Sequence, residues 1–98
     1  MTFAEFERSL KSATPPRGLA PALVALWWAQ RNDWDQAHTI VMNEESREAA
    51  WVHAYLHRVE GDLGNAGYWY RQAGQVAAKD SLEAEWERIA ATLLGSRT

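Results

Sequence analysis

The stretch Asn32-Asp33-Trp34-Asp35-Gln36-Ala37 returns 29 residues later as Gly61-Asp62-Leu63-Gly64-Asn65-Ala66. Each copy begins with a residue that tolerates the left-handed backbone region, followed by an aspartate that can cap a helix. The alanine that closes each copy suits the close approach of two antiparallel helices. The two stretches therefore predict the turns of two related helical hairpins.

The same shift aligns residues on the amino-terminal side of each turn. Ala25 falls on Ala54, and Leu23 falls on Val52. A repeat of this kind is expected when one supersecondary unit is used twice. We predict the first hairpin over residues 19–43 and the second over residues 46–74.

The flanking segments also carry helix signals. Thr2-Phe3-Ala4-Glu5 has the pattern of a capping box, and Asp80-Ser81 can cap a final helix. We expect helices over residues 1–14 and 80–95 that cap the two hairpins at both ends. The prediction is an all-α fold with about six helices in a single domain, residues 1–98.

The composition restricts the function. The chain has 47% hydrophobic residues, a net charge of −3 and no cysteine. The charge argues against a nucleic-acid partner, and the lack of cysteine excludes disulfides and thiolate metal sites. The longest nearly apolar run, Leu19–Ala29, is too short to span a membrane. With no signal peptide pattern at its start, the chain is expected to be cytoplasmic, without a membrane partner or a cofactor.

No pattern points to catalysis. Glu83, Glu85 and Glu87 are spaced by two residues, so on a helix they point apart and do not form an acid–base pair. We interpret them as a solvated face. Gly61-Asp62-Leu63-Gly64 follows a helix rather than a strand, which is not the setting of a phosphate-binding loop. The sequence favours a protein that is not an enzyme.

The turn motifs, with small residues at Ala25, Ala54 and Ala73, resemble the tetratricopeptide repeat over residues 19–74. The segments Trp51–Arg58 and Tyr68–Arg71 are also similar to segments of small bacterial proteins of unknown function. The resemblance to the repeat implies a right-handed stack of hairpins that binds a protein or peptide, or forms a homo-oligomer. It places partner-binding residues on the inner face of each first helix: Leu26 and Gln30, then Glu48, Trp51, Tyr55 and Arg58.

The histidines offer a different function. His53 and His57 are four residues apart and leave the same helix face, and Glu60 follows three residues later. The trio could bind a divalent metal. In the repeat alignment the two histidines fall at packing positions equivalent to Val24 and Trp28, so buried histidines bonded to neighbouring helices are the favoured interpretation. His38 comes near His57 if the hairpins stack.

The leading hypothesis is therefore a non-enzymatic module for protein interaction or self-association. Its motivation is the repeat, together with six tryptophans that six short helices need not bury completely. The alternative is a helical protein that binds a small ligand or a metal ion through His53, His57 and Glu60.

Overall fold

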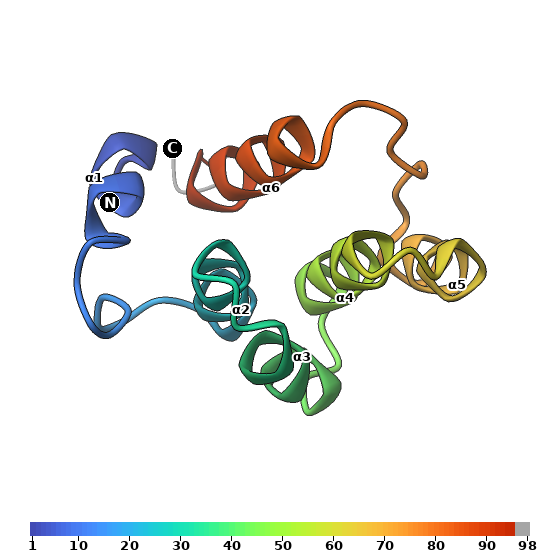
Figure 1. Cartoon of the computed structure of the whole chain (residues 1–98), viewed down its shortest axis with the longest axis horizontal. Helices are drawn as coiled ribbons and strands as arrows, with labels where there is room; N and C mark the ends of the chain where they lie inside the picture. The colour runs from blue at the N-terminus through green and yellow to red at the C-terminus, as the bar shows by residue number, and fades with distance from the viewer. Residues whose placement is uncertain (96–98) are drawn as a thin grey trace.

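The computed structural model describes residues 1–95, which form six α-helices and no strand (Figure 1). This confirms the predicted all-α fold. The helices are α1 (Phe3–Ser9), α2 (Pro21–Gln30), α3 (Trp34–Met42), α4 (Arg47–Val59), α5 (Leu63–Ala73) and α6 (Leu82–Gly95). None of these helices is long and apolar enough to cross a lipid bilayer.

The two repeated stretches form the turns α2–α3 and α4–α5. Asn32 and Gly61 occupy the left-handed region, with φ angles of 65° and 87°. The following aspartates cap the next helix: Asp33 accepts from the Gln36 N–H at 3.1 Å, and Asp62 accepts from the Asn65 N–H at 3.2 Å. The local chemistry predicted for both turns is confirmed.

Helix α1 is shorter than predicted. The capping box of Thr2 and Glu5 is present, but the helix ends at Ser9. The N–H groups of Leu10 and Lys11 bond three residues back rather than four, which tightens the chain into a turn. Pro15 and Pro16 follow, and proline disfavours helical geometry in the residue before it.

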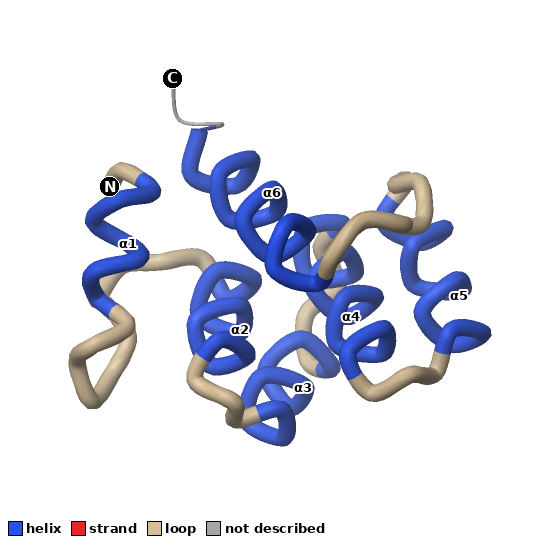
Figure 2. The backbone as a smooth tube through the Cα atoms, turned by 45° about the horizontal axis from the view of Figure 1, so that its top comes forward, coloured by secondary structure: helices blue, strands red, loops and turns tan. Residues whose placement is uncertain are grey.

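The two hairpins lie side by side, with α3 packed against α4, and α6 returns across α2 and α4 (Figures 1 and 2). Helix α1 packs against α6. The radius of gyration of 12.3 Å matches the value of about 13 Å expected for a folded chain of this length. Helix α6 thus closes the side of the hairpins on which the resemblance places a partner.

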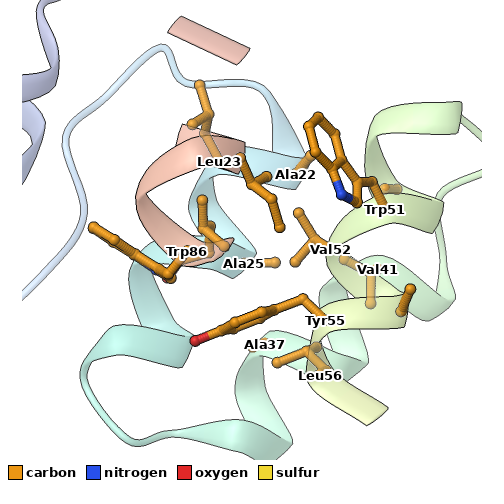
Figure 3. Close-up of a cluster of buried hydrophobic side chains, with 14 of the residues drawn as sticks. Ala22, Leu23, Ala25, Ala37, Val41, Trp51, Val52, Tyr55, Leu56 and Trp86 are labelled. Atoms are coloured by element: carbon orange, nitrogen blue, oxygen red, sulfur yellow. The ribbon is translucent and has the colours of Figure 1, made fainter. Parts of the chain in front are cut away.

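The core lies between the hairpins and α6 (Figure 3). Ala25 and Ala37 are fully buried, as is Ala54, and Ala66 is 2% exposed. Trp86 joins α6 to this core, because its indole N–H donates to the Leu26 carbonyl at 2.9 Å. Small residues let the paired helices approach, and the large aromatic residue fills the space under α6.

Candidate metal centre

The inner face of the hairpins is covered by α6. Leu26 is 0%, Tyr55 5% and Trp51 8% exposed, and Figure 3 shows Trp51 and Tyr55 within the core cluster. Leu26 is fully buried, and Trp51 and Tyr55 expose only a small part of their side chains, so the three do not form a broad aromatic face for a partner. We expected Trp51 and Tyr55 to form an exposed binding surface, and this expectation is wrong. The last helix, α6, covers the face on which they lie.

Arg58 also has an internal partner. Its guanidinium donates to Glu85 at 2.9 Å, and the Tyr70 hydroxyl donates to the other oxygen of the same carboxylate at 2.5 Å. Glu85 is fully buried, so its interpretation as part of a solvated face is wrong. Burial and the hydrogen bond to Glu85 raise the pKa of Tyr70. The three residues connect α4, α5 and α6.

Two of the predicted partner-binding residues remain accessible. Gln30 is half-buried, with its side-chain amide 3.5 Å from Glu83, and Glu48 is exposed. Glu48 lies at the rim of a hollow of about 630 Å³ between α2, α4 and α6. The hollow is lined by both apolar and charged side chains, including Leu23, Arg17 and Glu44. It does not contain the aromatic or imidazole side chains singled out in the sequence.

The structure brings together all three histidines of the chain. His38 comes from α3, and His53 and His57 come from α4. One ring nitrogen of each lies within 4.8 Å of the other two, and the Nε2 atoms of His38 and His53 are 3.0 Å apart. Two nitrogen ligands of one tetrahedral zinc ion are about 3.3 Å apart, because each Zn–N bond is about 2.0–2.1 Å long. The spacing of His38 and His53 is therefore close to that of two ligands of one zinc ion, and His57 lies within 4.8 Å of both.

Aromatic side chains from both hairpins hold the imidazole rings. On α3, the Trp34 ring stacks on His38 with centroids 4.5 Å apart, and its N–H donates to the Leu56 carbonyl at 2.7 Å. On α5, Trp69 stacks on His53 at 3.9 Å. The rings are thus fixed from two sides by α3 and α5, with α4 between them. Rings held in this way lose little freedom when they bind a ligand.

Burial also sets the charge of the cluster. His53 is 4% exposed, and burial, followed by the nearby His38 and His57, lowers its pKa to about 4. The pKa of His38 is lowered mainly by burial and also by His57, while Glu60 and Asp35 oppose the shift. Both rings are therefore neutral at neutral pH. A neutral imidazole is the form that coordinates a metal ion.

The three candidate ligands in the structure differ from the predicted three by one residue. His53 and His57 do lie together, but His38 joins them where Glu60 was expected. Glu60 instead contacts the Nδ1 atom of His57 at 2.7 Å, and with Asp62 it forms a second group of candidate ligands around that ring. The spacing of residues on one helix could predict His53 with His57. Only the packing of α3 against α4 brings His38 to them.

A scan against protein-family models finds no family that matches the chain, and searches of the curated proteins and of the solved structures find no match either.

Proposed function

We propose that this protein binds one divalent transition-metal ion through His38, His53 and His57. The observation that carries the proposal is that the only three histidines of the chain, from two different helices, meet in one largely buried cluster. Packing alone does not require three imidazoles at one point. Apolar side chains would fill the same space without the cost of burying polar nitrogens.

The ligand set indicates the class of metal. Imidazole nitrogen suits zinc, copper, nickel and iron, whereas magnesium and calcium prefer oxygen ligands. Three protein ligands also leave a fourth position on a tetrahedral ion for water or another donor. The proposal concerns binding alone and assigns no reaction to that position.

The same cluster also has a purely structural interpretation. In the absence of metal, the 3.0 Å contact between His38 and His53 is a hydrogen bond, in which one Nε2 donates its proton and the other accepts. Such a bond would help join the hairpins without any ion. The two interpretations differ in one measurable respect, because only the first predicts saturable binding with one ion per chain.

Isothermal titration calorimetry of the tag-free protein with Zn²⁺ and with Ni²⁺ tests the proposal. We expect one ion per chain, no heat with Mg²⁺, and quenching of tryptophan fluorescence by Ni²⁺, because Trp34 and Trp69 stack on two of the ligands. His38→Gln removes the half-buried ligand at little cost in packing and should abolish both signals. The absence of a saturable signal in the parent protein, or an unchanged signal in His38→Gln, would overturn the proposal.

A role in interaction or self-association, built on tetratricopeptide-like hairpins, is a second proposal, and Gln30 and Tyr55, two of the residues that the resemblance singles out, line a groove that could serve it. Val59 and Leu82 are 42% and 39% exposed, and both line the same groove, of about 240 Å³, beside the turns. We propose this groove as the contact between two copies of the chain. Sedimentation velocity at increasing concentration tests it: Val59→Ser should weaken any dimer, and a monomer at all concentrations would contradict it.

A further inference from the structure

Glu60 lies directly after α4 and turns back onto the last turn of that helix. Its Oε2 atom is 2.7 Å from the Nδ1 atom of His57, three residues earlier. The His57 side chain is 7% exposed, whereas that of Glu60 is 39% exposed. A carboxylate at the surface thus forms a short hydrogen bond with a buried imidazole, on the ring nitrogen opposite Nε2.

This contact determines which nitrogen of His57 carries the proton. An ionised carboxylate can only accept hydrogen bonds, so the Nδ1 atom must be the donor. A neutral imidazole has one proton, and the Nε2 atom then keeps a free lone pair. A carboxylate in this position holds a ligating histidine in one tautomer and one orientation, and it makes the other nitrogen a stronger ligand.

Among residues 1–95, Glu60 is the carboxylate that is hydrogen-bonded to the Nδ1 atom of His57. Its ring contacts are with Trp34, His38 and His53, all through ring faces or edges. Asp62 is the other carboxylate nearby, and its Oδ1 atom accepts from the N–H of Asn65 as the cap of α5. Glu60 is therefore the partner of His57 at Nδ1, while the other contacts of the ring are aromatic.

We infer that Glu60 is a positioning residue for the proposed metal site, which presents the Nε2 lone pair of His57 to the ion without being a ligand itself. The inference rests on the proposed function, because it assigns Glu60 its role in the same site. If Glu60 had only a structural role, its replacement would not change the tautomer of His57.

The first test uses the metal-free protein. Long-range ¹H–¹⁵N NMR spectra of the histidine rings distinguish the two tautomers. We expect His57 as the Nδ1–H tautomer in the parent protein and in Glu60→Gln, whose amide oxygen can still accept. Glu60→Ala should shift His57 toward the Nε2–H form. Finding the Nε2–H form in the parent protein, or no change in Glu60→Ala, would overturn the inference.

The second test measures the affinity for Ni²⁺ and Zn²⁺. Loss of such an outer carboxylate typically costs about 10–100-fold in metal affinity. We expect a loss in that range for Glu60→Ala and a smaller loss for Glu60→Gln. Glu87→Ala, which removes an exposed carboxylate from α6, is the matched control and should leave the affinity unchanged. Equal affinities for the parent protein and Glu60→Ala would contradict the inference.

The two tests separate the inference from the proposed function. A parent protein that binds no metal refutes the metal site, and with it the role of Glu60 as a positioning residue. A parent protein that binds metal normally while Glu60→Ala changes neither the tautomer nor the affinity refutes the inference alone. Circular dichroism spectra of each variant establish that the helices are intact, so that a lost affinity is not a lost fold.

Discussion

At the scale of single residues, Glu85 shows how strongly the fold depends on one buried charge. Its carboxylate is fully buried and is compensated by the Arg58 guanidinium and the Tyr70 hydroxyl. Removing one partner of a buried ion pair leaves the other uncompensated, and the cost of that loss is larger than the net contribution of the intact pair. The three residues therefore act as one unit that holds α6 to the second hairpin.

We expect Glu85→Ala to lower the free energy of unfolding by about 3–5 kcal/mol, because Tyr70 loses its acceptor and Arg58 keeps only its hydrogen bond to the Asp80 carbonyl. Urea denaturation monitored by circular dichroism measures the change. Glu87→Ala, two residues further along α6 and exposed, should remain within about 0.5 kcal/mol of the parent protein. A loss below about 1 kcal/mol for Glu85→Ala would show that the hydrogen bond to the Asp80 carbonyl is enough to compensate Arg58.

The histidine cluster should make the metal-free protein sensitive to acid. The pKa of His53 is about 4 in the folded chain and about 6.5 in an unfolded one. As the pH falls from 6.5 to 4, the unfolded state therefore binds more protons than the folded state, and stability decreases. Above pH 6.5 the ring is neutral in both states, so this contribution is then constant.

Melting temperatures between pH 7.5 and pH 4.5 test this expectation. His53→Gln cannot gain the proton, so its melting temperature should fall less steeply over the same range. The difference between the two melting temperatures at each pH gives the contribution of His53 alone, because the acidic side chains titrate in both proteins. Parallel curves for the two proteins would contradict the pKa assigned to His53.

At the scale of the elements, each hairpin depends on its turn. Asn32 and Gly61 occupy equivalent positions with positive φ angles, and an aspartate follows each of them as the helix cap. Glycine adopts this region without strain, whereas other residues do so at a cost of about 1–2 kcal/mol. Asparagine is among the few other residues that visit it routinely.

We expect Gly61→Ala to destabilise the protein by about 1–2 kcal/mol through backbone strain alone. A Cβ atom at Gly61 would meet nothing within 4 Å, so no steric clash contributes. Gly64→Ala is the matched control: it lies inside α5, also meets nothing, and should stabilise the protein by about 0.5–1 kcal/mol. Thermal unfolding compares the three proteins, and a neutral Gly61→Ala would show that the turn can relax.

At the scale of the whole molecule, the proposed metal site would join the two hairpins. His38 belongs to the first hairpin, and His53 and His57 belong to the second. A ligand that binds only the folded chain stabilises it by an amount fixed by its concentration and dissociation constant. Unfolding separates α3 from α4 and so dismantles the site.

At a free metal concentration 100 times the dissociation constant, we expect a gain of about 2.7 kcal/mol in the free energy of unfolding. The melting temperature should rise with Zn²⁺ and return to its starting value when a chelator is added. His38→Gln should show no rise. A melting temperature that does not change with Zn²⁺ in the parent protein would count against the site.

The fold could be predicted largely from the sequence because its signals are local. Asp33 and Asp62 cap the helices that follow them, and Asn32 and Gly61 adopt the left-handed region, so all four act on the backbone within a few positions of themselves. Hydrogen bonds to the first turn of a helix do not depend on the rest of the chain. The number of helices and the two hairpins follow from such signals, whereas α1 ends earlier than they predict.

Only the tertiary structure decided which surfaces are open and which side chains meet. The spacing of His53 and His57 predicted their proximity, but the addition of His38 depends on how α3 packs against α4. The burial of Tyr55 and Glu85 depends on where α6 lies, which no residue in α6 reveals by itself. Contacts between distant segments arise from the packing of whole helix faces, and a periodic pattern specifies a face without naming its partner.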